Sequence, residues 1–374
     1  TLVNGVIWPH LEVAARWIRF RVLNASNSRT YRFELHDENG APIPGAMLLI
    51  GTDGGLLREP VALNQLTLGS AERADILINF RAFRGRQLTL ANTLNQPFEP
   101  GTTTRNPDVM QFRVRATSVI DRFTRPNTLS PSFVRLTHDT LPDHGHRWLV
   151  LTALQNRHPE MWEMVEIDQP PPALPVDGII QVMLPGAVEL TTLQRVGRTF
   201  RDAANFYIAQ ESWEQWRILN VSPIAHPIHL HLIQFQALSR QLFNVAGFDR
   251  VVGGTTTPVT YTGEGTRDPE ETGWKDTIRV NGSRMVNGVL VGELVSIIGQ
   301  FSGASGRFMY HCHILEHEDA GMMSTFVVMP EQVMTIDPHT GGGHHTTPRQ
   351  TTLWDDHPRY IGPPSDAASP HRPQ

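Results

Sequence analysis

Residues 19–26 read RFRVLNAS, and residues 215–222, which lie 196 positions further on, read QWRILNVS. Apolar and polar side chains alternate in the first stretch, with Ile18, Phe20 and Val22 on one side of the chain and Arg19 and Arg21 on the other. Such a period of two predicts a β-strand with one buried and one exposed face. Its recurrence indicates two copies of one β domain.

The same alternation appears elsewhere in the chain. It recurs in residues 31–35 and 110–114, and turn signals such as Asn39-Gly40 and residues 53–55 separate the segments. The chain also has 30 Gly and 28 Pro residues, a content that suits short strands joined by many turns. These patterns predict an all-β fold. Residues 193–208 form the one segment for which a helix is expected.

The repeat and the composition divide the chain into four parts. We expect a first β domain at 1–117, a connector containing Pro and Thr at 118–145, and a second β domain at 146–334. Residues 335–374 are rich in Pro, His, Thr and Gly and lack an apolar period, so the C-terminal tail is predicted to be disordered.

Charge, apolar runs and cysteine content exclude several kinds of partner, a membrane span and a disulfide. The chain of 374 residues has a net charge of −5 and no basic tract, so neither a nucleic acid nor an anionic membrane surface is expected. The most apolar run, residues 288–299, is interrupted by Glu293, and we expect a soluble protein. Cys312 is the single cysteine, which excludes an intrachain disulfide.

Two clusters carry the residues with metal-binding chemistry. Residues 226–231 read HPIHLH, and residues 311–322 read HCHILEHEDAGM. Two imidazoles, one thiolate and a distant thioether are the ligand set of blue copper. Cys312, His317 and Met322 follow each other at intervals of five, so a loop leaving a strand can fold them around one ion. His226 would join them from a second strand.

Strand geometry predicts a second site beside the first. Along a strand, Cys312 points to one face and His311 and His313 to the other, while His229 and His231 likewise share a face. The four histidines can therefore converge on further metal.

Other interpretations of these histidines have less support. Zinc prefers a closed shell of four ligands and has no use for a Met at that spacing. The pair His144 and His146 is interpreted as a feature of the connector rather than a ligand pair.

Several motifs resemble those of one protein family. Residues 3–9 read VNGVIWP, residues 71–75 read AERAD, and residues 273–277 read GWKDT. Together with the two histidine clusters, they resemble the bacterial multicopper oxidases, in the group of spore-coat laccase, bilirubin oxidase and phenoxazinone synthase. That family has three cupredoxin domains, each a Greek-key β-sandwich. The resemblance implies that this chain corresponds to the second and third domains.

The resemblance also assigns roles to individual residues. His317 would be the point at which substrate electrons enter, and Glu318 would supply protons near a trinuclear cluster. The implied copper ligands are His226, Cys312, His317 and Met322 for type 1, His229 for type 2, and His231, His311 and His313 for type 3.

The first copy of the repeat has no equivalent ligands. At the offset of 196, His226, His229 and His231 fall on Thr30, Phe33 and Leu35, as the family's ligand-free middle domain requires. The family's trinuclear cluster takes four more histidines from its first domain. Because the chain starts abruptly at Thr1 without Met, we expect this first cupredoxin domain upstream or on a partner chain.

These features predict a laccase-like bacterial oxidase. Its partners would be O2, reduced by four electrons to water, and a small-molecule electron donor such as a phenol, aminophenol or pigment. Copper would be the cofactor, at the type 1 site and, once the missing domain is supplied, at the type 2 and type 3 sites. The alternative is a non-enzymatic blue copper electron-transfer protein, or a structural relic with only the type 1 site. Any targeting segment would precede Thr1.

Overall fold

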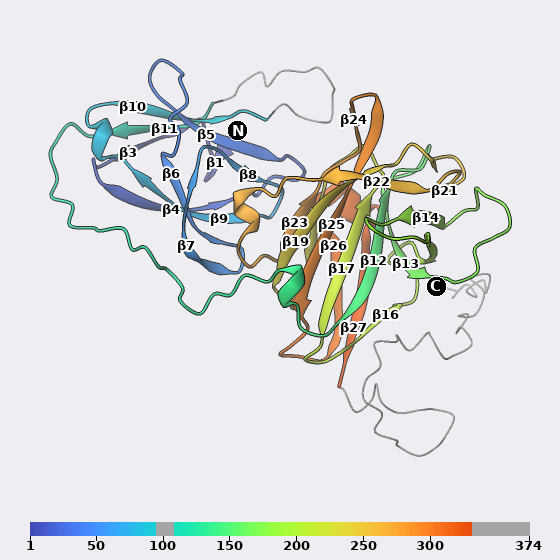
Figure 1. Ribbon diagram of the computed structural model, residues 1–374. Coiled ribbons are helices and arrows are strands. Elements are labelled where there is room, and N and C mark those ends of the chain that lie inside the picture. Colours follow the sequence, from blue (N-terminus) through green and yellow to red (C-terminus); the bar gives the residue numbers. More distant parts are fainter. Residues whose placement is uncertain (95–107, 331–374) are drawn as a thin grey trace, which may run out of the picture.

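The computed structural model describes residues 1–94 and 108–330. Nearly all regular structure in this part of the chain is β, and the strands form two groups that lie beside each other (Figure 1). The predicted all-β class is therefore confirmed. The tail predicted to be disordered, residues 335–374, lies outside the described residues.

The first group of strands forms two sheets over one core. Its strand orders are β4-β9-β6-β7 and β3-β11-β10-β5-β8, and a small hairpin, β1-β2, lies beside them. The elements are β1 Leu2–Val3, β2 Val6–Ile7, β3 His10–Val13, β4 Trp17–Leu23, β5 Tyr31–His36, β6 Met47–Thr52, β7 Gly55–Leu63, β8 Leu66–Leu68, β9 Arg73–Asn79, η1 Arg81–Phe83, β10 Gln87–Asn92 and β11 Asp108–Val114.

Alternating side chains build this core as the sequence predicted. Leu35, Leu49, Ile76 and Phe112 come from four strands of the two sheets and pack in one buried cluster. Ile18, Phe20 and Val22 of β4 pack against it, while the neighbouring Arg19 and Arg21 are exposed. The core thus lies between the two sheets, as in a β-sandwich.

The second group is larger. A nine-stranded sheet runs β17-β12-β13-β15-β14-β22-β19-β25-β24, and a five-stranded sheet runs β16-β27-β26-β18-β23. The elements are η2 His138–Thr140, β12 His144–Thr152, β13 Glu160–Glu166, β14 Ile179–Met183, β15 Thr191–Gly197, β16 Phe206–Ala209, β17 Trp213–Asn220, β18 His226–Leu230, β19 Phe235–Asn244, β20 Phe248–Asp249, β21 Gly254–Thr255, β22 Val259–Glu264, η3 Pro269–Glu271, β23 Thr277–Val280, β24 Arg284–Val286, β25 Val289–Gln300, β26 Gly306–Cys312, α1 Leu315–Asp319 and β27 Met323–Met329.

The nine-stranded sheet closes on itself, because β17 pairs with both β12 and β25. Trp148, Trp162, Leu193 and Phe243 point into the closed sheet and form one apolar cluster. The opposite face of β12, with Leu149 and Leu151, packs with the five-stranded sheet in a second cluster. This second cluster surrounds the strands that carry the predicted ligands.

The helix expected at residues 193–208 is absent, and that prediction was wrong. Thr191–Gly197 forms β15, which is paired on both sides by β13 and β14. Farther on, the Asp202 carboxylate accepts hydrogen bonds from the backbone N–H groups of Arg198 and Thr199 at 2.7 and 2.9 Å. Strand pairing and this local side-chain turn both compete with helix formation, and here they prevail.

The long segment between the two groups runs along the outside of the first group before it reaches the second (Figure 1). Asp121 accepts a hydrogen bond from the Trp17 backbone at 2.9 Å, and the Leu129 N–H donates to the Arg58 carbonyl at 2.8 Å. Farther on, Arg135 donates to the Gln236 side chain at 3.1 Å. Strand β12 then begins at His144, two residues before the predicted start of the second domain.

A buried polar junction joins the two groups. The Lys275 ammonium, which has no exposed surface, lies 2.9 Å from an Asp53 carboxylate oxygen and 3.2 Å from a Glu72 carboxylate oxygen. Glu270 of η3 accepts a hydrogen bond from the Thr67 N–H at 2.8 Å. These contacts join residues about two hundred positions apart, so the two groups of strands share one interface.

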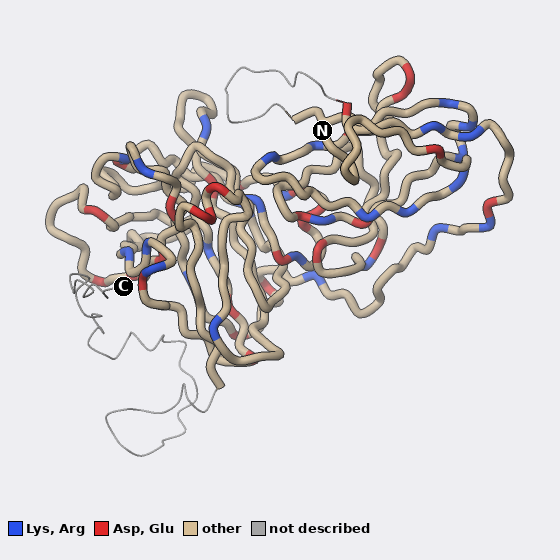
Figure 2. The backbone as a smooth tube through the Cα atoms, turned by 180° about the vertical axis from the view of Figure 1, so that it is seen from behind, with Lys and Arg blue, Asp and Glu red and all other residues tan. Residues whose placement is uncertain are grey.

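Charged residues of both signs occur over the two groups, as Figure 2 shows along the backbone. None of the helices in the described ranges is both long enough and apolar enough to cross a bilayer.

Glu270 makes the junction sensitive to pH. The carboxyl is buried, and its Oε2 atom has no hydrogen-bond partner among the described residues. Burial raises the pKa of Glu270 from 4.5 to about 8. Between these values the folded chain keeps a proton that the unfolded chain has released, so the free energy of unfolding falls as the pH rises.

We expect Glu270→Gln to remove this fall, which amounts to at most about 1.4 kcal/mol per pH unit within the window. Urea unfolding at about pH 5 and about pH 8 measures the effect. The free energy of unfolding of the variant, relative to that of the parent protein, should be larger at the higher pH. Glu59→Gln, at an exposed position of β7, is the control and should show no such gain. An equal stability difference between Glu270→Gln and the parent at both pH values would contradict the prediction.

Candidate metal centre

Two antiparallel strands hold most of the predicted ligands. In the pairing of β18 with β26, Ile228 lies opposite Cys312 and His229 lies opposite His311. Backbone hydrogen bonds continue past both strand ends, from His313 N–H to the Pro227 carbonyl at 2.7 Å and from His231 N–H to the Met309 carbonyl at 3.0 Å. The histidines just beyond the strands therefore keep the alternation of the strands themselves.

One group of ligand atoms lies on the core side of these strands. Cys312 Sγ is 3.6 Å from His226 Nδ1 and 3.8 Å from His317 Nδ1. The three ligand atoms lie within 4.8 Å of one another, close enough to share an ion. His226 and Cys312 have no exposed surface, whereas His317 is partly exposed.

Helix α1 and the turn after it bring the Met322 backbone beside this group. The Met322 N–H donates to the His317 carbonyl at 2.8 Å, and the Cys312 N–H donates to the Met322 carbonyl at 3.0 Å. Gly321, between helix and strand, has a φ of 105°, a conformation that side chains other than glycine rarely adopt. Met322 is fully buried in the same apolar cluster as Cys312.

Burial sets the protonation of this group before any metal binds. It raises the pKa of the Cys312 thiol to about 12 and lowers the pKa of His226 well below its usual value. Burial also lowers the pKa of His317. Both imidazoles therefore offer lone pairs at neutral pH, and an incoming metal ion must displace the thiol proton.

A second group lies on the opposite side of the two strands. His229, His231 and His311 each offer one nitrogen within 4.8 Å of the others, and the Nε2 atoms of His231 and His311 are 3.2 Å apart. The His313 ring lies 4.9 Å from that of His311 and 5.4 Å from that of His229, measured between centroids. The structure thus gathers all four predicted histidines.

Glu318 of α1 orients one ring of this histidine cluster. Its Oε2 atom is 3.2 Å from His311 Nδ1, which directs Nε2 of the same ring toward His231. Burial lowers the pKa values of His231 and His311, and lowers that of His313 to about 4. These three imidazoles are thus neutral and ready to coordinate near pH 7.

Sequence reasoning missed the residues that hold the ligands in place. Ser222 Oγ lies 2.9 Å from His226 Nε2, which leaves Nδ1 facing the sulfur. The Asn220 side chain accepts from the Ser222 N–H at 2.9 Å, as Asn24 does from Ser26 at 3.1 Å in the first copy. The shared Asn-x-Ser spacing of the repeat could have revealed this turn.

His144 and His146 lie together on β12, with ring centroids 4.9 Å apart. His144 Nδ1 donates to the Pro142 carbonyl at 2.7 Å. The pair is thus part of the turn into β12, which agrees with its interpretation as a structural feature.

The donor chemistry of the two groups fits copper. Two imidazoles and a buried thiolate are the blue-copper set, and a cluster of imidazoles suits further copper ions. Fold and donors together define a copper-binding all-β protein.

Comparison with known proteins agrees with this class. Residues 171–332 match the multicopper oxidase family. The laccase of Bacillus subtilis strain 168 is 36% identical over 86% of this chain and 53% of its own length, and that of Bacillus stratosphericus is 35% identical with the same coverage. The chain spans about half the length of these curated relatives.

A solved structure supports the fold. A variant of the McoA multicopper oxidase from Aquifex aeolicus superposes with a TM-score of 0.62 at 24% identity, covering 87% of this chain and 59% of that one. The predicted pair of cupredoxin domains is thus confirmed as the fold class. The chain belongs to the multicopper oxidase family.

Replacing Cys312 with Ser removes the only thiolate while keeping the size of the side chain. We expect the copper-loaded variant to lose the blue absorption of a thiolate-bound copper and one equivalent of metal. The histidine cluster should still bind copper, because it lies on the other side of the strands. Absorption spectra and metal analysis measure both effects, and a variant that stays blue would rule out Cys312 as a ligand.

Proposed function

We propose that this chain is the copper-bearing part of a laccase-type oxidase that couples oxidation of small reducing substrates to reduction of O2 to water. The observation that carries the proposal is the pair of ligand groups on opposite sides of β18 and β26, joined by the backbone around Cys312. His311 and Cys312 are adjacent in sequence, so the two sites are one residue apart along the chain.

In this proposal, each ligand group has its own role. His226, Cys312, His317 and Met322 hold type 1 copper, His229 holds type 2 copper, and His231, His311 and His313 hold type 3 copper. Copper, when bound, supplies one-electron redox chemistry. His226, Cys312 and Met322 are fully buried, so the partly exposed His317 ring is where a phenol or aminophenol makes contact.

Glu318 is proposed to hold and deliver protons on the histidine side. Its carboxylate lies 3.2 Å from His311 Nδ1 and remains 26% exposed, so it contacts both the cluster and solvent. Reduction of O2 to water consumes protons, and a carboxyl in this position can pass them inward from the surface.

A further cupredoxin domain is proposed to complete the histidine cluster. The four histidines present all lie on the same side of β18 and β26, and the relatives are about twice as long as the part that this chain matches. The additional ligands would come from a domain upstream or on a partner chain. In the alternative, a blue electron-transfer protein, the same chain functions without that domain.

Loading the chain with copper, without any further domain, distinguishes the oxidase from the electron-transfer protein. We expect a blue protein that consumes almost no O2 with a phenolic donor, and rapid O2 uptake once the missing domain is supplied by coexpression. An oxygen electrode and an absorption spectrum measure both. Rapid uptake by the chain alone would contradict the need for more ligands, and a colourless loaded protein would contradict the type 1 assignment.

Glu318→Gln in the completed enzyme tests the proton role. We expect O2 uptake to fall by at least about tenfold, because the amide cannot deliver a proton, while the blue absorption stays unchanged. Asp319→Asn, at an exposed position of the same helix, is the matched control. Equal turnover of both variants would remove Glu318 from the mechanism.

A further inference from the structure

His229 is the ligand of the histidine cluster whose hydrogen position the structure fixes most firmly. Its Nδ1 atom lies 2.8 Å from the backbone carbonyl of Asp276, and a carbonyl oxygen only accepts hydrogen bonds. Nδ1 therefore carries the hydrogen, and Nε2 keeps the lone pair that a metal ion needs. Thr277 Oγ1, 3.2 Å away, and an Asp276 carboxylate oxygen, 3.6 Å away, surround the same Nδ1 atom.

Asp276 is itself held by a residue of the other group of strands. Arg73, the first residue of β9, donates two hydrogen bonds to the two Asp276 carboxylate oxygens, each 2.6 Å long. This two-pronged geometry fixes both the position and the rotation of a carboxylate. Burial would raise the pKa of Asp276, but the hydrogen bonds from Arg73 hold it well below its usual range.

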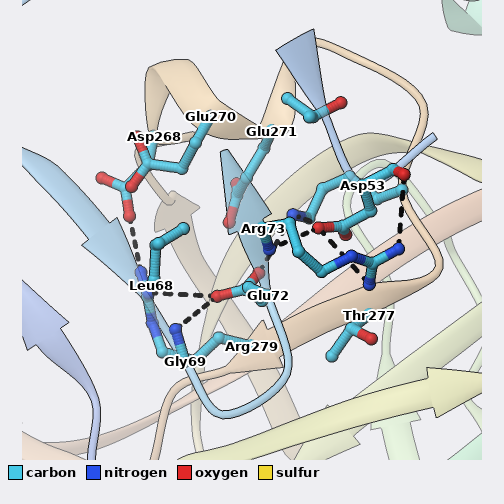
Figure 3. Close-up of polar contacts among 12 residues, drawn as sticks. Asp53, Leu68, Gly69, Glu72, Arg73, Asp268, Glu270, Glu271, Thr277 and Arg279 are labelled. Carbon is cyan, nitrogen blue, oxygen red and sulfur yellow. Dashed lines mark hydrogen bonds and ion pairs between the residues drawn. The ribbon is translucent and has the colours of Figure 1, made fainter. Parts of the chain in front are cut away.

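Arg73 is held in turn by residues of its own group of strands. Its backbone N–H donates to Asp53 Oδ1 at 2.7 Å, and its guanidinium donates to the Asp53 carbonyl at 3.3 Å and the Ala71 carbonyl at 3.1 Å. Asp53 is fixed in turn by the buried Lys275 (Figure 3 shows Asp53 and Glu72 beside Arg73). A chain of short contacts thus runs from the ligand-free half to His229.

The interface between the two groups of strands does not depend on the Arg73–Asp276 pair. Lys275 already bridges Asp53 and Glu72 without any exposed surface, and Thr52 Oγ1 donates to the Trp274 carbonyl at 2.7 Å. The Arg73 side chain is 35% exposed and lies at the rim of that junction. What distinguishes the Arg73–Asp276 pair is its place directly behind a predicted metal ligand.

We propose that Arg73 is a positioning residue for His229: with Asp276 it fixes the tautomer and orientation of an imidazole that belongs to the other half of the molecule. The metal-binding part of this inference rests on the proposed function. Outer partners that orient a ligating histidine typically change metal affinity by about 10- to 100-fold when removed.

The first arm of the test uses the chain without metal. In the parent protein, long-range ¹H–¹⁵N NMR spectra should show His229 with its hydrogen on Nδ1, the signal being assigned by its loss in His229→Gln. Arg73→Leu should shift and broaden this signal, because Asp276, whose backbone carbonyl accepts the hydrogen, loses the forked contact that holds it in place. An unchanged Nδ1–H signal in Arg73→Leu would overturn the proposal.

Arg19→Leu is the matched control. Arg19 makes a similar forked pair with Asp75 between β4 and β9, in the same half of the molecule, but at an exposed position. Arg73→Lys keeps the charge at the junction without the fork and should give an intermediate spectrum. If Arg73→Leu does not fold, Arg73→Lys and Asp276→Asn decide the question, and unchanged His229 signals in both would overturn the proposal.

The second arm measures copper binding. Titration of Arg73→Leu with Cu²⁺ should show affinity at the histidine cluster reduced by about tenfold or more, with the blue absorption of the Cys312 site unchanged. Unchanged affinity would overturn the proposal. If the parent protein binds no copper at the cluster even when the further domain is coexpressed, the proposed function fails, whereas the tautomer arm still decides the role of Arg73.

Discussion

The register of β18 against β26 is the constraint from which both sites follow. Because side chains alternate along a strand, placing His229 opposite His311 forces the neighbouring Cys312 to the other face. A slip by one residue would turn the thiolate out of the core and the histidines into it. The apolar cluster of Ile228, Tyr310 and Met322, all buried, makes such a slip costly, so packing of the core also specifies the metal chemistry.

The sequence was enough to predict the fold class and which histidine and cysteine side chains the fold brings together. Period-two alternation, the repeat and the spacing of Cys312, His317 and Met322 are local patterns that survive folding. The segment 193–208 shows the limit of this reasoning, because strand pairing with β13 and β14 overrode its local character. Ser222, Asp276 and Arg73 were not assigned roles, since their contacts with ligands depend on where distant strands meet.

The first group of strands does more than support the fold. The second group of strands carries His226 and Cys312, while the first contributes Asp53 and Glu72 to a buried network of charges and Arg73 at its rim. Removing one member of such a network leaves another buried charge without a partner, which is strongly destabilising. Other arrangements of the interface would break these pairs, so the network favours a single arrangement. Fixed geometry is what the cluster around His229 requires.

The most direct test of the central claim is crystallography of the copper-loaded chain, with anomalous diffraction measured on both sides of the copper absorption edge. We predict one copper ion bonded to Cys312 Sγ and to Nδ1 of His226 and His317, enclosed in the core. Any copper at the four histidines would be a separate peak across the strands. Copper peaks confined to surface histidines, with Cys312 free of metal, would contradict it.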